Sequence, residues 1–426
     1  MTPAKAPSRP LKVTLVSHSD LLGGAAVVTY RLMEALRRHG VDAQMVVYTK
    51  LSDDPYVHLI GSRWIRGVKF MAERICIAIA NGINRANLFS VSIANIGMPI
   101  HKHPLVRQAD VVVLGWINQG LMSLNGIRKL ASLNKPIIWT MHDMWNLTGI
   151  CHHAHECRGY LRQCGHCQFL SGTSSADLSH AVWLKKRKLY STVPISFVAV
   201  SNWLAGCCRA SSLLRNCDVR VIPNAFPVDS FPTTPRSGVA LPTVSPDKNL
   251  IVFGAARLDD PIKGLQYAID ALNILFDNNP RLANNSQAVF FGALKNSLAF
   301  EQLRFPYTHV GRINDPLTLR CLYASAKVVL STSLYETLPG TLIEGQASGC
   351  LPVTFGRGGQ DDIVEHMVNG YIADYCNAKS VAQGIEWAMT QTPDRNRLHE
   401  SVRLKFSSDI VAQKYIDLFN ELLKRS

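Results

Sequence analysis

The feature that most constrains the fold of this 426-residue chain is an alternation of strand and helix patterns that occurs twice. In the first half, short apolar runs alternate with amphipathic helical patterns, beginning with the buried-type run 11–17 (LKVTLVS). Further strands are predicted at 41–48, 110–114, 136–140, 195–200 and 219–222. This alternation is typical of parallel β-α-β units in a doubly wound sheet.

A proline-rich stretch divides the chain. Residues 223–247 contain six prolines and interrupt the alternation, so we expect a linker there. A second series then predicts strands at 250–253, 288–291, 327–330 and 351–354, and an amphipathic helix at 410–424. The predicted parts are a disordered lead (1–10), an N-terminal domain (11–224), a linker (225–248), a C-terminal domain (249–405) and a C-terminal helix (406–426). Ligands of such sheets bind at the carboxyl ends of the strands, so we expect the chemistry in the cleft between the domains.

Composition indicates a folded protein with anionic partners. The chain is 47% hydrophobic and has a formal net charge of +14, which favours nucleic acid, phosphorylated small molecules or a negative membrane surface. Its basic residues are scattered and no nucleic-acid motif occurs, so we expect no nucleic-acid partner. No apolar run reaches the roughly 18 residues that a spanning helix needs. Residues 1–10 lack an apolar core for export, and we therefore expect a cytoplasmic protein.

Two carboxylates occur in the segment 330–349 (LSTSLYETLPGTLIEGQASG). Glu336 lies in a predicted loop, and Glu344 lies about one turn into the helix that follows Pro339. Proline favours the first turn of a helix, where exposed N–H groups bind phosphate. Both carboxylates can face one ligand and accept hydrogen bonds from adjacent hydroxyls of a ribose or hexose. The alternative is a helix with one acidic capping residue and one solvent-facing glutamate.

Two cations occur in the segment 254–264 (GAARLDDPIKG), directly after a predicted strand. Arg257 and Lys263 lie in the strand-to-helix loop, where a guanidinium fork and an ammonium can hold a diphosphate. The alternative is a pair of solvated surface cations. The chain contains no Asp-x-Asp motif, so a divalent metal need not hold the diphosphate and we expect no cofactor to be required for catalysis.

Together these segments resemble the retaining glycosyltransferases of family 4, which have the two-domain GT-B fold. The family has an Arg and a Lys after the first strand of the C-terminal domain and two glutamates with seven residues between them. It commonly has a Gly-rich turn after the first strand, here Gly23-Gly24, and an Ile-Pro-Asn segment at the hinge, here 222–224. The resemblance implies an α/β fold of two facing Rossmann-like domains, with a C-terminal helix that crosses back to the N-terminal domain. It also implies an acceptor-side N-terminal domain and a C-terminal domain that binds the nucleotide sugar.

The resemblance also implies roles for residues. Arg257 and Lys263 would neutralise the leaving diphosphate, Glu344 would bind the ribose hydroxyls, and Glu336 would contact the donor sugar as a catalytic residue. The other donor-binding residues implied are Gly340, Thr341, Leu342, Gly24 and Asn224. His142, in the run 139–143 (WTMHD), matches a catalytic family histidine near the reacting sugar. The alternative for His142 is a hydrogen-bonded histidine at a strand end. Family members often have Phe-Gly or Phe-Pro after the first glutamate, whereas this chain has 337–340 (TLPG), which leaves the donor sugar open.

The implied function is transfer of a hexose from a UDP- or GDP-linked donor, with retention, to a saccharide or polyprenyl-diphosphate-linked acceptor. Residues 140–170 also resemble an exopolysaccharide subgroup that includes colanic-acid assembly, which predicts a role in cell-surface polysaccharide synthesis. One alternative is a basic nucleic-acid- or membrane-binding protein without transferase activity. Two others are a phosphorylase or epimerase of the same fold and a non-catalytic assembly partner.

A cysteine-rich insert is predicted at 151–167. Its four thiols, with several histidines among them, suit a tetrahedral structural zinc site. The predicted ligands are Cys151, Cys157, Cys164 and Cys167. The alternatives are thiols that pack without a ligand and a redox or disulfide role.

A helix is predicted over 63–80. Trp64, Val68, Met71, Ile75 and Ile79 fall on one face, nearly opposite Arg66, Lys69 and Glu73. One interpretation is an interfacial helix against anionic lipid, which would place the protein on the inner face of the plasma membrane. The other is a Rossmann helix that buries its apolar stripe.

Overall fold

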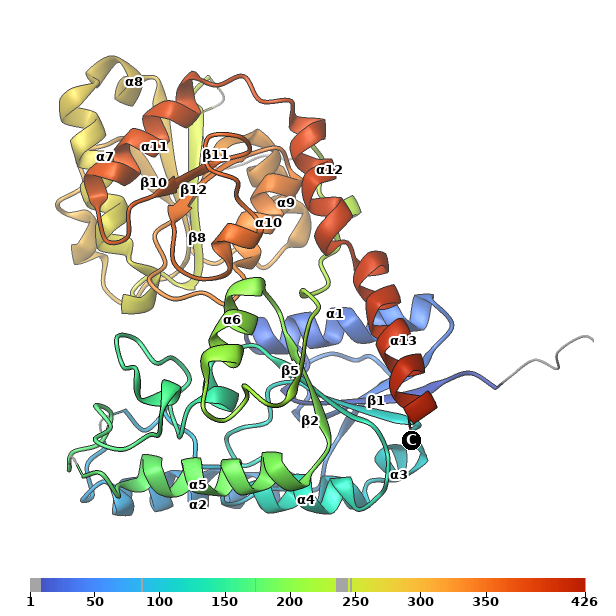
Figure 1. Ribbon diagram of the computed structural model, residues 1–426. Helices are drawn as coiled ribbons and strands as arrows, with labels where there is room; N and C mark the ends of the chain where they lie inside the picture. Colours follow the sequence, from blue (N-terminus) through green and yellow to red (C-terminus); the bar gives the residue numbers. More distant parts are fainter. Residues whose placement is uncertain (1–8, 86, 173, 235–243, 246, 426) are drawn as a thin grey trace, which may run out of the picture. The chain divides into compact units, whose positions relative to one another are not determined.

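The computed structural model describes residues 9–85, 87–172, 174–234, 244–245 and 247–425. The chain divides into two compact units, the first made of 1–225 with 411–426 and the second of 226–410 (Figure 1). Residues 1–8 of the predicted lead and 235–243 and 246 of the predicted linker lie outside the described residues. Arg9, in the same predicted lead, donates two hydrogen bonds to the Asp110 carboxylate, so the described structure begins before the predicted domain start at residue 11.

Unit 1 contains a parallel sheet of seven strands in the order β3-β2-β1-β4-β5-β6-β7. Its strands are β1 (Lys12–Ser19), β2 (Asp42–Thr49), β3 (Val57–Leu59), β4 (Val111–Leu114), β5 (Ile137–Met141), β6 (Ile195–Ala199) and β7 (Asp218–Val221). Every residue of β4 and β5 is buried, as expected for central strands that are covered on both faces. All pairings of described strands in this sheet are parallel, which confirms the β-α-β prediction for this half.

The helices of unit 1 cover both faces of the sheet. They are α1 (Gly24–Arg38), α2 (Arg63–Ala80), α3 (Pro104–Gln108), α4 (Leu124–Ala131), α5 (Leu178–Thr192) and α6 (Asn202–Ala210). In Figure 1, α2, α4 and α5 lie on one side of the sheet and α1 on the other. Helix α1 buries Leu32, Met33 and Leu36 in a core that also contains Val13 and Leu15 of β1, which is the usual arrangement for a helix of this fold.

Helix α2 does not follow this arrangement. Its predicted apolar stripe, Trp64 to Ile79, is exposed, with Trp64 78% and Ile79 67% accessible. Glu73 and Arg74, on another face of the helix, are buried instead. The interpretation of this segment as a Rossmann helix that buries its apolar stripe is therefore wrong. The physical reason is that Glu73 and Arg74 find backbone partners inside the unit, described below.

The C-terminal helix α13 (Ser408–Arg425) packs on unit 1, as predicted, although it follows α12 (Arg395–Phe406) of unit 2. Val411, Ala412 and Phe419 are fully buried in the core shared with β1 and β2. The Tyr415 hydroxyl lies 2.8 Å from Thr140 Oγ1 at the end of β5. The chain end thus completes the N-terminal unit.

Unit 2 repeats the doubly wound arrangement in a sheet of order β10-β9-β8-β11-β12-β13. Its strands are β8 (Asn249–Arg257), β9 (Ser286–Ala293), β10 (Tyr307–His309), β11 (Ala326–Ser331), β12 (Leu351–Phe355) and β13 (Tyr371–Ala373). Its other helices are α7 (Leu265–Asn278), α8 (Pro280–Asn284), α9 (Pro316–Ser325), α10 (Gly340–Ala347) and α11 (Ala378–Thr390). The start of the predicted linker packs within this unit, since Phe226 N donates to Phe406 O at 2.9 Å.

The two sheets confirm the predicted fold class of two Rossmann-like α/β domains with a C-terminal helix returning to the first. Across the described ranges, every helix is too short or too polar to cross a bilayer.

Candidate active site

In unit 2, the loops after the neighbouring strands β8 and β11 are joined by hydrogen bonds. Leu334 N donates to Ile262 O at 2.7 Å, and Thr332 Oγ1 donates to Gly264 O at 2.8 Å. Gly264 has φ 64°, and a Cβ placed there would lie 2.1 Å from Thr332 O, so only glycine fits this approach. The two predicted donor segments therefore form one rigid edge at the carboxyl ends of their strands.

Lys263 and Glu336 meet at this edge. Lys263 Nζ lies 2.5 Å from Glu336 Oε1, with the two side chains 29% and 19% exposed. The Glu336 charge raises the pKa of Lys263, so the ammonium stays charged throughout the physiological range. The structure thus brings together one cation and one carboxylate that the sequence places 73 residues apart.

Arg257, at the end of β8, is held within its own loop. Its guanidinium lies 3.3 Å from both carboxylate oxygens of Asp259, and that hydrogen bond raises the pKa of Arg257. The Arg257 side chain is half exposed. It is available to an anion that competes with Asp259 and is less constrained than Lys263.

Helix α10 follows directly after Glu336 and begins at Gly340, with Pro339 at the N-cap position. Gly340 and Thr341 are half-buried and Leu342 is fully buried. The first N–H groups of an α-helix have no intrahelical acceptor, so this end is suited to an anion. Glu344 is half-buried in the second turn. Burial, and to a lesser extent the Glu344 carboxylate, raise the pKa of the buried Tyr323.

A third loop, after β12, supports Glu336 and was not predicted as part of the site. Gly359 N donates to Glu336 O at 2.9 Å. Gly358 has φ 133°, and a Cβ there would lie 2.3 Å from Glu336 O. The signal for this loop is a Gly-Gly pair that begins four residues after the predicted strand 351–354, at the same sheet edge as the two donor segments.

In unit 1, a pocket of about 410 Å³ lies at the carboxyl ends of β1, β4 and β5. It brings together the predicted Gly24 and His142. Nothing lies within 4 Å of a Cβ placed on Gly24, so the backbone there is open to a ligand. The remaining lining residues are Ser17, His18, Ser19, Leu22, Gly23, Ala25, Ala26, Trp116, Gln119, Asp143 and His153.

Two histidines of this pocket, His18 and His142, are held neutral. Burial lowers the pKa of His142 to about 4, and its Nε2 lies 3.5 Å from Thr29 Oγ1. Burial also lowers the pKa of His18 to about 4, although Nδ1 lies 3.2 Å from Asn118 O. At neutral pH both rings are therefore uncharged hydrogen-bonding groups. Asn224, also predicted as a site residue, lines a second small cavity of unit 1 that includes His142.

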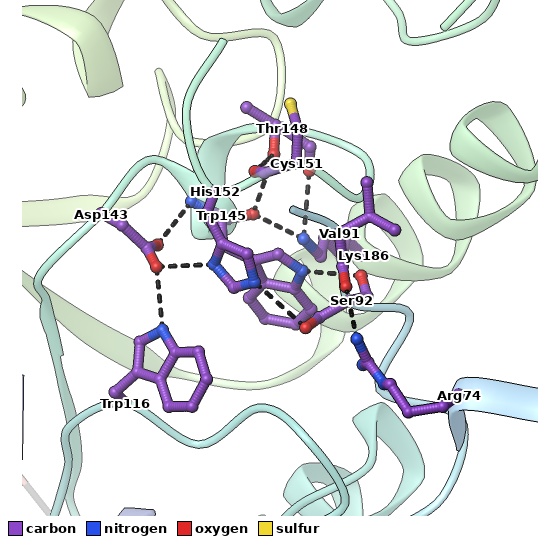
Figure 2. Close-up of polar contacts among 10 residues, drawn as sticks. All are labelled: Arg74, Val91, Ser92, Trp116, Asp143, Trp145, Thr148, Cys151, His152 and Lys186. Carbon is purple, nitrogen blue, oxygen red and sulfur yellow. Dashed lines mark hydrogen bonds and ion pairs between the residues drawn. The ribbon is translucent and has the colours of Figure 1, made fainter. Parts of the chain in front are cut away.

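Asp143, which lines the pocket, is the centre of a buried polar network (Figure 2). It accepts hydrogen bonds from Trp116 Nε1 at 2.9 Å, Trp145 N at 2.8 Å and His152 Nδ1 at 2.7 Å. His152 Nε2 lies 3.1 Å from Ser92 Oγ. Burial alone raises the pKa of Asp143, but the charge and hydrogen bond of His152 outweigh it and lower this pKa to about 2. The network fixes Trp116 in the pocket wall.

Lys186 of α5 joins this network through Trp145. It is fully buried, donates to Trp145 O at 2.5 Å and Thr148 O at 3.1 Å, and lies 3.2 Å above the Trp145 ring. Burial lowers its pKa well below the usual value. Neither Trp116 nor Lys186 was predicted as a site residue, because their partners lie 27 to 41 residues away in the chain. His152 lies among the histidines of the cysteine-rich segment, and its partner Asp143 lies nine residues before it.

The four cysteines of the predicted insert are free thiols. Burial raises the pKa of Cys151 to about 12 and that of Cys164 to about 11. Gly149 N donates to Cys164 Sγ at 3.1 Å. In the part of the chain that the structure describes, no three His, Cys, Asp or Glu side chains are grouped so as to hold a metal ion. The zinc site with Cys151, Cys157, Cys164 and Cys167 stays a prediction.

Two family models match the chain, one in each half. The model described as Glycosyltransferase Family 4 matches residues 22–230, and the one described as Glycosyl transferases group 1 matches residues 242–405. An uncharacterized glycosyltransferase of Methanocaldococcus jannaschii is 29% identical over 181 residues, which are 41% of this chain and 46% of that protein. The chain thus spans about half the length of this curated relative.

Solved structures share the fold at low identity. A glycosyltransferase from Rickettsia africae has a TM-score of 0.64 at 15% identity, covering 98% of this chain and 100% of its own. Anabaena HepE in complex with UDP and glucose has a TM-score of 0.62 at 15% identity, covering 96% and 99%. Sucrose-phosphate synthase from Thermosynechococcus elongatus has a TM-score of 0.65 at 15% identity, covering 98% and 100%.

Two parallel Rossmann-like units with a returning C-terminal helix define the GT-B fold class. Within that class, the two family matches identify the chain as a member of glycosyltransferase family 4, with a group 1 domain as its second half.

Proposed function

We propose that this protein is a retaining transferase that moves a hexose from a UDP- or GDP-linked donor to a saccharide or lipid-linked acceptor. The observation that carries the proposal is the Lys263–Glu336 pair, held where the loops after β8 and β11 are joined. The match of residues 242–405 to a glycosyltransferase model supports it independently. A complex of the similar Anabaena protein with UDP and glucose supports a nucleotide-sugar donor.

The proposed chemistry follows from charge. Breaking the bond between the anomeric carbon and the phosphate oxygen leaves positive charge on the sugar and negative charge on the diphosphate. Lys263 and Arg257 would stabilise the diphosphate, with the N–H groups of Gly340, Thr341 and Leu342 as further donors. Glu344 would accept from the ribose hydroxyls, and Glu336 would accept from the donor sugar while orienting Lys263. No step of this scheme uses a metal.

The proposed acceptor subsite is the pocket of unit 1. Its neutral His18 and His142, with Gln119 and two serines, offer hydrogen-bonding groups to hydroxyls. Trp116 offers an aromatic wall for the apolar face of a sugar. His142 would contact the reacting sugar, and Gly24 and Asn224 would lie beside the donor. We propose a role in cell-surface polysaccharide synthesis on the inner face of the plasma membrane, where lipid-linked acceptors are anchored.

The experiment is a thermal-shift and turnover panel with UDP-, GDP-, ADP- and dTDP-sugars. The variants are Lys263→Ala and Glu344→Ala, and the matched control is Arg304→Ala, which breaks an exposed ion pair with Asp277 in the same unit. A ligand at 100 times its Kd adds about 2.7 kcal/mol of stability. We expect a shift with one nucleotide family that disappears in both site variants and persists in the control. No shift with any donor, or an equal shift in all variants, contradicts the assigned site.

A further inference from the structure

Helix α2 presents an apolar stripe to the surface. Trp64, Val68, Met71, Ile75 and Ile79 are between 47% and 78% exposed. Their spacing of three and four residues aligns them along one face, about 22 Å long at 1.5 Å per residue. Contiguous exposed apolar surface of this kind marks an interaction site in a soluble protein.

The rotation of α2 is fixed by polar contacts on its inner side. Glu73 is fully buried and accepts hydrogen bonds from Ile93 N at 3.1 Å and Ala94 N at 3.0 Å. Arg74 donates to Val91 O at 3.1 Å and lies 3.2 Å from the Glu73 carboxylate. Turning the stripe inward would break these buried contacts. The contacts of Glu73 and Arg74 therefore keep the stripe exposed in the folded protein.

The exposed charges next to the stripe along the chain are all positive. Between residues 55 and 109 the only acidic residue is Glu73, which is buried. The basic residues of the same stretch are Arg63, Arg66, Lys69, Arg74, Arg85, Lys102 and Arg107. Arg63 and Arg85, near the two ends of the stripe, are exposed. The surface is therefore apolar along its centre and positive at its margins.

A shallow groove of about 500 Å³ lies at the N-terminal end of α2, lined by Arg63, Trp64, Gly67, Val68 and Met71. Nothing lies within 4 Å of a Cβ placed on Gly67, so this residue leaves the groove open. A cation beside apolar walls suits a phosphate headgroup followed by acyl chains.

We propose that this face of α2 docks on an anionic lipid bilayer. The apolar stripe would lie among the acyl chains, with Arg63 and Arg85 at the level of the phosphates. The net charge of +14 adds attraction to a negative surface. A second copy of the chain fits this surface less well. A two-fold symmetric contact through α2 would bring the positive margins of both copies together, and like charges repel.

Short contacts connect this face to the pocket of unit 1. The Tyr48 hydroxyl donates to Arg66 O of α2, and the Tyr48 ring stacks on His18 of the pocket at 4.9 Å between centroids. A Cβ on Gly120, next to Gln119 of the pocket, would lie 2.9 Å from Phe70 N. Docking through α2 therefore places the pocket near the headgroups. This step rests on the proposed function, since it makes the acceptor lipid-linked.

The test is co-sedimentation of the full chain with vesicles of mixed phosphatidylglycerol and phosphatidylcholine, and with vesicles of phosphatidylcholine alone. The variant is Val68→Glu with Ile75→Glu. The control is Val368→Glu with Leu404→Glu, which changes two similarly exposed apolar residues of unit 2. We expect binding to the anionic vesicles that weakens at least about tenfold in the α2 variant and less than twofold in the control. The donor thermal shift should be unchanged in both.

Other outcomes separate the alternatives. Equal binding of both vesicle types overturns the anionic specificity, and equal loss in variant and control overturns the assignment to α2. A concentration-dependent dimer in analytical ultracentrifugation that the α2 variant abolishes would make a second copy the occupant and overturn the lipid proposal. Loss of the donor shift in every protein, with vesicle binding intact, would defeat the proposed function and leave this surface standing.

Discussion

The candidate sites of the two units both lie at the carboxyl ends of parallel strands, but one is charged and the other presents mainly neutral groups. In unit 2, Lys263 and Glu336 form a charged pair that is partly open to solvent. In unit 1, His18 and His142 are kept neutral by burial, and the charge of Asp143 is enclosed by three hydrogen-bond donors. The difference fits the proposed division of roles, in which the edge of unit 2 would hold a diphosphate and the pocket of unit 1 would hold hydroxyls.

The largest effect is expected when the Asp143 carboxylate of unit 1 is removed. Asp143→Ala leaves Trp116 Nε1, Trp145 N and His152 Nδ1 buried without their acceptor. We expect a loss of about 3–5 kcal/mol of stability, because breaking a buried charged network leaves uncompensated polar groups. Urea unfolding followed by tryptophan fluorescence measures it. Asp374→Ala, at an exposed residue of unit 2, is the control, and a similar midpoint for the two variants would contradict the structural role of Asp143.

Removing the Lys263 ammonium of unit 2 should instead leave the fold intact and slow turnover. For Lys263→Ala we expect kcat to fall about 10²–10³-fold, the usual effect of losing one donor to a developing anion. Steady-state release of the nucleotide diphosphate measures it, with Arg304→Ala as the control. A drop of less than about tenfold would show that Lys263 does not contact the leaving group.

The stability of unit 1 should depend on pH through its histidines. The folded pKa of His142 is about 4, below the ordinary value of 6.5, so the unfolded chain binds more protons between these values. The contribution of His142 is complete above pH 6.5 and is lost as the pH falls toward 4, amounting to about 3 kcal/mol. Unfolding midpoints across this range measure it. His142→Gln should flatten the profile, whereas His39→Gln, at an exposed position, should not; identical profiles would contradict the assignment.

The smallest effect is expected at the C-terminal helix. Tyr415→Phe removes the hydrogen bond to Thr140 and leaves the Thr140 hydroxyl buried, so we expect a loss of about 1 kcal/mol. Differential scanning calorimetry measures the shift in Tm. Tyr307→Phe, on a partly exposed ring of unit 2, is the matched control, and an unchanged Tm for Tyr415→Phe would show that this bond adds nothing to unit 1.

Much of the fold was predictable because periodicity is a local property. Ten strands of the two sheets were predicted close to their observed ranges. The three that were missed, β3, β10 and β13, are three residues long. Each lies at an edge of its sheet, where a short pairing leaves little apolar pattern. The Lys263–Glu336 edge was predictable for a related reason, since loops that follow parallel strands meet at one side of a sheet.

The rest depended on contacts between segments far apart in the chain. The sequence by itself determined two α/β domains and the residues that share a face on each helix, and the family resemblance implied the returning helix. Only the tertiary structure decided which face of α2 turns inward, because that depends on the N–H groups of Ile93 and Ala94 meeting Glu73. It also decided that Asp143 lies beside Trp116 and His152, since periodicity orders residues along one element, whereas a buried charge needs partners that only the folded chain assembles.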